Sequence, residues 1–161
     1  MGVPLNNAKR TVCMKWADEG ETQVFAQQLA LEPSILNAEI ALRGDLGAGK
    51  TTLVRHLLRA LGVSGVIKSP TYTLVETYQG QQGPTPLNIW HLDFYRMNDP
   101  LEWEEAGLRD VFASAGLKLY EWPDRVMGLL SPPSLELELV VNLDESRSVK
   151  LHFDPLLWNL A

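Results

Sequence analysis

The eight residues from 44 to 51 constrain the fold of this chain more than any other segment. Their sequence is Gly44-Asp45-Leu46-Gly47-Ala48-Gly49-Lys50-Thr51, a glycine followed by four residues and then Gly-Lys-Thr. An apolar run at residues 39–43 precedes them, and leucine and valine at helical spacing follow them. A strand, a glycine-rich loop and a helix in this order are the context in which a Walker A loop binds phosphate.

The residue types in this loop suit phosphate binding. Glycines let the backbone wrap so that its amide groups converge on one point, and the start of the following helix also attracts anions. The Lys50 ammonium would reach the β- and γ-phosphates of a nucleotide, and the Thr51 hydroxyl would join the ligands of a Mg²⁺ ion. The alternative is a glycine-rich turn that leaves Lys50 exposed. The predicted nucleotide-binding residues are Gly44, Asp45, Leu46, Gly47, Ala48, Gly49, Lys50, Thr51 and Thr52.

Composition narrows the choice of ligand and partner. The sequence contains no Asn-Lys-x-Asp tetrapeptide of the kind by which GTPases recognise guanine, so ATP is the expected nucleotide.

The 161 residues include 14 Lys and Arg against 20 Asp and Glu, a formal net charge of −6. This balance excludes a large basic surface as the main means of gripping nucleic acid and argues against a polybasic membrane anchor. Cys13 is the only cysteine, which excludes an intramolecular disulfide and a cysteine-rich zinc site. With no apolar run long enough for a membrane span, we expect a cytoplasmic protein.

Hydrophobic periodicity predicts strands that alternate with helices and end in a hairpin. The expected strands cover residues 11–16, 39–43, 73–78, 87–92, 117–122, 135–140 and 149–153. The expected helices cover residues 21–31, 51–61 and 124–130, and Asp99-Pro100-Leu101-Glu102 is a typical helix start. Glycine, glutamine and proline at residues 80–86 indicate a loop. We therefore expect a single domain over residues 1–161, disordered at residues 1–7. Its expected fold is a three-layer α/β fold of the P-loop NTPase type, with a mixed central sheet and a C-terminal β-hairpin.

Three further segments place polar side chains at the ends of expected strands or near the loop. Asp93 closes the apolar strand 87–92, where a Walker B carboxylate would lie, although it could equally cap a turn. Glu121 ends the apolar run 117–120, so it would lie at the carboxyl end of a strand, where open α/β sheets bind ligands. The alternative is that it lies on an edge strand and faces water. Ser69 and Thr71 could sense a γ-phosphate as a switch segment does, although a proline turn is the commoner structure of such a tetrapeptide.

Taken together, four segments of the chain resemble the TsaE family, small ATPases of bacterial tRNA threonylcarbamoyladenosine modification. These segments are residues 44–52, Ser69-Pro70-Thr71-Tyr72, His91-Leu92-Asp93-Phe94-Tyr95-Arg96 and Glu121-Trp122-Pro123, in the order and approximate spacing of the family. The resemblance covers roughly residues 20–125 well and the terminal hairpin loosely. Tyr72 and Met97 are small departures, since the family commonly has Phe and Leu at these positions.

The resemblance implies roles for the residues that match. Lys50 and the loop amides would hold the nucleotide phosphates, and Asp93 would be the Walker B-type carboxylate needed for hydrolysis. Lys50 and Asp93 are therefore the expected catalytic residues. Thr51 and Glu121 would be the ligands of Mg²⁺.

The resemblance also implies a wider function. Ser69 and Thr71 would form a switch-like segment, and Trp122 would lie close to the site. The chain would be an ATPase that is weak alone and supports the transferase that modifies the adenosine next to the anticodon. It would bind the TsaB–TsaD heterodimer, with tRNA contacted mainly through that complex.

Two other functions remain open on the sequence. A P-loop small-molecule kinase would need an acceptor site and usually an arginine-rich lid. Residues 101–117 contain a single arginine, Arg109, and several glutamates that would repel a phosphorylated acceptor. A nucleotide-dependent interaction module would bind ATP with negligible hydrolysis. Because an isolated P-loop protein can be slow by a factor of about 10³ or more, slow turnover alone would not separate this module from an accessory ATPase.

Overall fold

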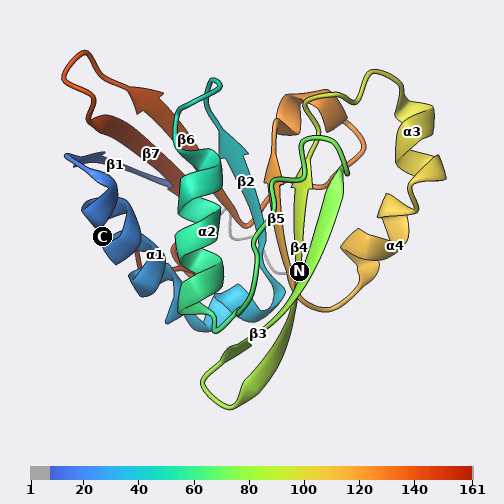
Figure 1. The fold of residues 1–161 in the computed structure, drawn as a ribbon, viewed down its shortest axis with the longest axis horizontal. Helices are drawn as coiled ribbons and strands as arrows, with labels where there is room; N and C mark the ends of the chain where they lie inside the picture. The colour runs from blue at the N-terminus through green and yellow to red at the C-terminus, as the bar shows by residue number, and fades with distance from the viewer. Residues whose placement is uncertain (1–7, 161) are drawn as a thin grey trace, which may run out of the picture.

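A seven-stranded mixed sheet with helices on both faces forms the body of the protein, in a computed structural model that describes residues 8–160 (Figure 1). The strand order is β1-β7-β6-β2-β5-β4-β3. The four inner strands β6, β2, β5 and β4 run parallel, whereas β1, β7 and β3 run antiparallel to their neighbours. The predicted three-layer α/β architecture with a mixed sheet is confirmed. The predicted disorder of residues 1–7 lies outside the described residues.

The elements follow the predicted order closely. The strands are β1 Arg10–Trp16, β2 Glu39–Arg43, β3 Val75–Gln82, β4 Thr85–Asp93, β5 Leu117–Glu121, β6 Leu135–Val141 and β7 Arg147–Phe153. The helices are α1 Glu19–Ala30, α2 Lys50–Ala60, α3 Pro100–Glu105 and α4 Leu108–Ala113, with two 3₁₀ turns, η1 Pro33–Asn37 and η2 Pro123–Val126. β6 and β7 pair as the predicted antiparallel hairpin. The Asp99 side chain caps α3 by accepting a hydrogen bond from the Leu101 amide at 2.9 Å, as the sequence predicts.

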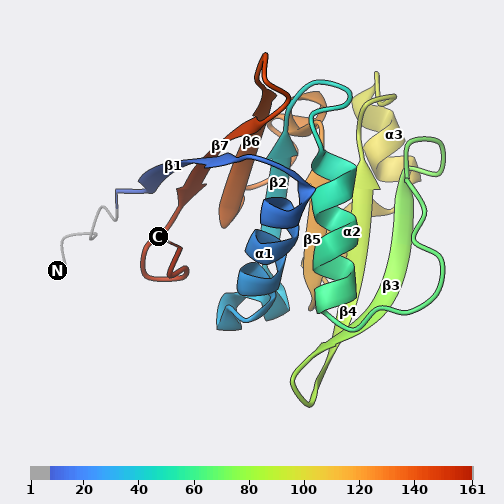
Figure 2. The same ribbon diagram turned by 60° about the vertical axis from the view of Figure 1, so that its left-hand side comes forward.

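Alternation along the inner strands divides the apolar core into two layers. On β2, Ile40 and Leu42 belong to the layer beneath α1 and α2, whereas Ala41 between them belongs to the opposite layer with Trp103 and Leu108. Figure 2 shows α1 and α2 side by side in front of the sheet, with α3 behind it. The two layers therefore place α1 and α2 on one face and α3 and α4 on the other.

The same alternation determines the side of the sheet to which the side chains at the ends of β4 and β5 point. Ile89 on β4 and Leu119 on β5 belong to the layer beneath α2. Because side chains on a strand alternate, His91, Asp93 and Glu121 point to the same face as these residues. The polar ends of two neighbouring strands therefore face the helix that follows the glycine-rich loop.

The predicted loop at residues 80–86 is wrong, because most of it extends a β-hairpin. β3 and β4 remain paired out to Gln82 and Thr85, so only Gly83 and Pro84 form the turn. The outer part of the hairpin extends beyond β5, whose pairing with β4 begins at Ile89 (Figure 1). The Gln82 amide donates hydrogen bonds to the carbonyl oxygens of Ala30 at 3.1 Å and Glu32 at 2.7 Å, which joins the hairpin to the end of α1. A strand with a free edge tolerates proline.

The predicted helix at residues 124–130 is also wrong in extent. It is a single 3₁₀ turn, η2, which starts at Pro123 and ends at Val126. Gly128 has a φ of 84°, a value that a right-handed helix does not allow. Across residues 8–160, no helix has both the length and the apolar character needed to cross a bilayer.

Candidate active site

The glycine-rich loop lies between the end of β2 and the start of α2, at the carboxyl end of the parallel strands (Figure 1). Gly44, Gly47 and Gly49 have φ values of 147°, 81° and 107°, which residues with a side chain rarely adopt. Gly49 precedes α2 and has no side chain with which to cap it, so the first amide groups of α2 remain available to an anion. The strand, loop and helix of the Walker A prediction are therefore all present.

Gly44 has the least room of the loop glycines. A Cβ atom at this position would lie 2.7 Å from the carbonyl oxygen of Leu139 on β6 and 3.0 Å from the Cβ of Ala48. We expect Gly44→Ala to lower the free energy of unfolding by about 2–4 kcal/mol, because backbone strain adds to a clash with a neighbouring strand. Urea unfolding followed by circular dichroism measures this loss.

Gly47→Ala is the matched control for that substitution. Gly47 also has a positive φ, but a Cβ atom there would meet nothing within 4 Å. It should therefore cost only the conformational strain, about 1–2 kcal/mol. An equal loss of stability in both variants would contradict the predicted clash between a Cβ atom at residue 44 and strand β6.

Lys50 is buried at the first position of α2, with an exposed fraction of 5%. Its ammonium donates hydrogen bonds to the carbonyl oxygens of Gly44 and Asp45, the latter at 3.4 Å. Burial lowers the pKa of Lys50, while the nearby carboxylates, Glu121 first among them, oppose this shift. The ammonium therefore lies inside the loop and within the field of buried acidic groups, and the alternative of an exposed lysine is wrong.

Two buried carboxylates lie on neighbouring strands beside this lysine. Asp93 ends β4 and Glu121 ends β5, and the two are direct partners in the parallel pairing of these strands. The Thr51 hydroxyl of α2 donates a hydrogen bond of 3.4 Å to Oε1 of Glu121. Glu121 is 2% exposed on an inner strand between β2 and β4, so the alternative of an edge-strand glutamate facing water is wrong.

Asp93 caps a turn, one of the two interpretations that the sequence left open, and it also contacts Thr71. Its Oδ1 accepts a hydrogen bond from the Tyr95 amide at 2.9 Å, which caps the turn after β4. Its Oδ2 accepts one from the Thr71 hydroxyl at 3.2 Å, and Thr71 in turn is 2.9 Å from the Ser69 hydroxyl. Residues 70–74 also form the predicted turn, closed by a backbone hydrogen bond of 2.8 Å. The segment that carries Ser69 and Thr71 is therefore joined directly to Asp93.

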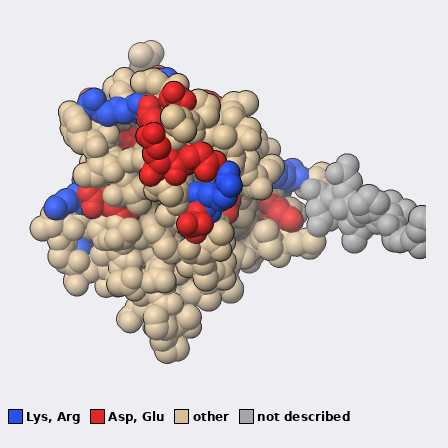
Figure 3. Space-filling model, turned by 90° about the vertical axis from the view of Figure 1, so that its right-hand side faces the viewer, with Lys and Arg blue, Asp and Glu red and all other residues tan. Residues whose placement is uncertain are grey.

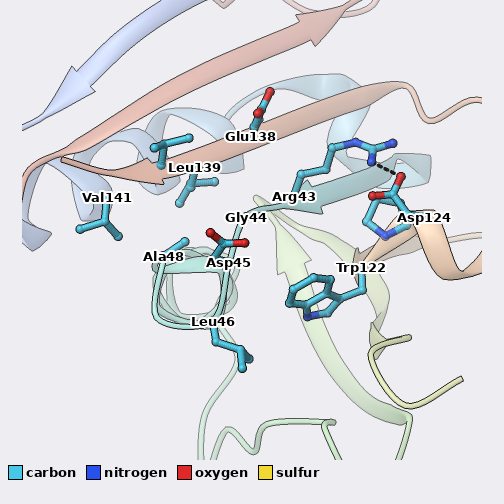
Figure 4. A pocket seen from close by; sticks show the side chains of 12 residues that line it. Arg43, Gly44, Asp45, Leu46, Ala48, Trp122, Asp124, Glu138, Leu139 and Val141 are labelled. Carbon is cyan, nitrogen blue, oxygen red and sulfur yellow. Dashed lines mark hydrogen bonds and ion pairs between the residues drawn. The ribbon is translucent and has the colours of Figure 1, made fainter.

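Trp122, which follows β5 directly, lies beside Lys50. Its ring centroid is 4.2 Å from the Lys50 ammonium and 5.0 Å from the ring of Tyr95. Trp122 has a φ of 58°, an uncommon value for a residue with a side chain, which turns the chain sharply after β5. A pocket of about 550 Å³ opens beside the loop. Figure 4 shows the Trp122 ring among the residues that line it, together with Leu46, Glu138 and Val141.

Three basic residues of this region were not predicted from the sequence. Arg43 pairs with Asp124 (Figure 4) and, at 3.0 Å, with Glu136. Arg147 on β7 donates a hydrogen bond of 3.1 Å to the carbonyl oxygen of Ala48 in the loop. The Arg147 contact could not be found from sequence spacing, because the hairpin lies far from the loop along the chain.

The third is His91, whose side chain is fully buried on β4. Its Nε2 lies 2.9 Å from Oε2 of Glu121. One signal was present in the sequence: His91 precedes Asp93 by two residues on a strand, which puts both side chains on one face.

Three comparisons relate this chain to known proteins. A family model described as "Threonylcarbamoyl adenosine biosynthesis protein TsaE" matches residues 16–149. The tRNA threonylcarbamoyladenosine biosynthesis protein TsaE of Haemophilus influenzae is 43% identical over 117 residues, which are 70% of this chain and 68% of that protein. The protein of the same name from Rickettsia prowazekii is 36% identical over 143 residues, 86% of this chain and 93% of that protein. The crystal structure of Bacillus subtilis YdiB has a TM-score of 0.72 at 24% sequence identity, covering 91% of this chain and 87% of that one. The fold is accordingly the P-loop NTPase-like α/β fold that the sequence predicts.

Proposed function

The chain belongs to the TsaE family of threonylcarbamoyl adenosine biosynthesis proteins, and from this premise we propose that it is a Mg²⁺-dependent ATPase that supports tRNA threonylcarbamoyladenosine biosynthesis. One observation carries the proposal: Lys50, Thr51, Asp93 and Glu121 converge where β2, β4 and β5 end. Phosphoryl transfer to water needs a cradle for the phosphates, a place for a metal ion and a carboxylate near the reacting group. These four residues supply the groups for all three.

The loop residues 44–52 would bind the phosphates of ATP. The Lys50 ammonium, which donates to the carbonyl oxygens of its own loop, would turn to phosphate oxygens as stronger acceptors. Few water molecules compete for a side chain that is 5% exposed, so its attraction for phosphate is stronger than in bulk water. Trp122 would keep the ammonium in place through the contact with its ring.

The donor atoms beside Lys50 fit Mg²⁺, an ion that prefers oxygen ligands. We assign the hydroxyl of Thr51 and Oε1 of Glu121, 3.4 Å apart, as the protein ligands. Within residues 8–160, no three His, Cys, Asp or Glu side chains form a metal cluster, which suits an ion that keeps phosphate and water ligands. When bound, the ion would neutralise charge on the phosphates.

Asp93 and the segment before β3 would act in hydrolysis. Asp93 is 6% exposed and keeps Oδ2 on the Thr71 hydroxyl, so a movement of Ser69 and Thr71 would change the surroundings of this carboxylate. A segment that responds to the γ-phosphate would in this way be coupled to the catalytic group.

A small-molecule kinase is less well supported than an ATPase. Arg109, the arginine of residues 101–117, pairs with Glu104 at the junction of α3 and α4. Acidic side chains gather on the face that carries these helices (Figure 3), and they would repel a phosphorylated acceptor. A nucleotide-dependent interaction module remains the second candidate, since it would use the same loop.

We further propose that residues 1–161 act as one ATPase domain in the cytoplasm and that the protein partners are the TsaB–TsaD heterodimer. The formal net charge of −6 favours contacts with protein over a direct grip on tRNA, which would be held mainly by the complex.

Phosphate release from Mg-ATP tests this function. We expect slow release by the chain alone, as for P-loop proteins without a supplied arginine, and a rise of about 10-fold or more when TsaB and TsaD are added. EDTA should abolish release in both cases. Fast release that ignores the pair would contradict the accessory role. Tight ATP binding with no release in either case would contradict hydrolysis and favour the kinase or the interaction module.

A further inference from the structure

His91 is a fully buried histidine that the proposed function does not use. It lies on β4 beside Leu119 of β5, on the face where Ile89 and Leu119 contribute to the apolar layer beneath α2. Burying an imidazole among apolar side chains costs free energy unless its ring nitrogens find partners. The neighbours of His91 therefore favour an apolar residue at this position, unless a specific bond requires histidine.

One ring nitrogen has such a partner and the other does not. Nε2 lies 2.9 Å from Oε2 of Glu121, while Nδ1 is buried and without a hydrogen-bond partner among residues 8–160. A carboxylate that binds Mg²⁺ only accepts hydrogen bonds, so with Glu121 as a metal ligand we assign the proton to Nε2, which donates it. Packing alone does not account for a histidine with an orphaned nitrogen, whereas its bond to Glu121 does.

The two oxygens of Glu121 consequently have separate partners. His91 holds Oε2, and Oε1 lies 3.4 Å from the hydroxyl of Thr51. With Oε2 held, rotation of the carboxylate would break a charge-assisted hydrogen bond, so Oε1 stays directed at Thr51. We propose that His91 is a positioning residue, which orients Glu121 as a ligand for Mg²⁺. This inference rests on the proposed function of Glu121. Hydrogen-bond partners of metal ligands commonly orient those ligands, and His91 would do so for Glu121.

An isosteric pair of variants separates the hydrogen bond from packing. His91→Gln places an amide nitrogen near the position of Nε2 and can still donate to Glu121. His91→Met has similar length and no donor. Electron paramagnetic resonance of Mn²⁺, titrated into protein saturated with ADP, measures the metal site without relying on turnover. We expect His91→Met to weaken Mn²⁺ binding by about 10- to 100-fold and His91→Gln to retain most of the affinity. ADP binding in EDTA should be unchanged in both variants.

A double mutant sharpens the test. In the Glu121→Gln background, His91→Met should have little further effect on Mn²⁺ affinity, because the carboxylate that it orients is already gone. If His91→Met does not fold, His91→Asn serves instead, since its shorter side chain cannot reach Glu121 and the same loss is expected.

Three results would overturn the inference: wild-type Mn²⁺ affinity in His91→Met, an equal loss in His91→Gln, or a loss of the same size in the Glu121→Gln background. A wild-type protein that binds neither ADP nor Mn²⁺ would instead overturn the proposed function, and the inference with it.

Discussion

Lys50→Ala should lower the affinity for ATP by about 10²- to 10³-fold, the largest effect on binding expected from one substitution in this chain. Lys50 is 5% exposed, and its ammonium lies in the loop where the phosphates would bind. Its loss would leave Glu121 and Asp93, whose carboxylates act on Lys50, next to the incoming phosphates without the intervening cation. Isothermal titration with ATP in the presence of EDTA would measure this effect apart from the metal ion.

Lys150→Ala is the control for the change in net charge. Lys150 is exposed on β7, where its neighbours Val149 and Leu151 face the core and it faces the opposite side of the sheet. Lys50→Ala and Lys150→Ala carry the same net charge, so a difference in their ATP affinity reports the loss of the lysine in the loop. Equal ATP affinity in wild type, Lys150→Ala and a folded Lys50→Ala would refute the phosphate-binding assignment of the loop.

Much of the fold could be predicted because its signals are local. The order of strand, glycine loop and helix lies within residues 39–61, and the alternation of β6 and β7 is visible within each strand. The hairpin end at residues 80–86 was missed because its polar residues match a loop in composition. Whether such a segment pairs depends on how far β3 and β4 extend beyond β5, which is a property of the whole sheet.

The site shows the same division between local and distant information. Lys50 and Thr51 follow from a contiguous motif, and strand ends marked Asp93 and Glu121 as candidates. The sequence could not decide whether Glu121 is buried, because that depends on β5 lying between β2 and β4. The contacts of His91 with Glu121 and of Arg147 with the loop join residues far apart in the chain. The roles assigned to these residues in binding and hydrolysis are predictions that the variants test.

Asp93→Asn should lower phosphate release by about 10²-fold or more while leaving ATP affinity near that of wild type. The substitution removes the charge but preserves the shape: the asparagine oxygen can still accept from the Tyr95 amide, and its amide can donate to the Thr71 hydroxyl. The turn after β4 should therefore survive, and the loss should fall on the chemical step. Release in the presence of TsaB and TsaD gives the rate, and calorimetric titration gives the affinity.

Asp99→Asn makes the same chemical change outside the site. Asp99 caps α3 through the Leu101 amide, and asparagine caps helices about as well, so stability, binding and phosphate release should all remain near wild type. A loss of release confined to Asp93→Asn would distinguish Asp93 from Lys50, whose replacement should act at the binding step. If Asp93→Asn turned over ATP at the wild-type rate, Asp93 would be a turn cap alone, and hydrolysis would need another carboxylate.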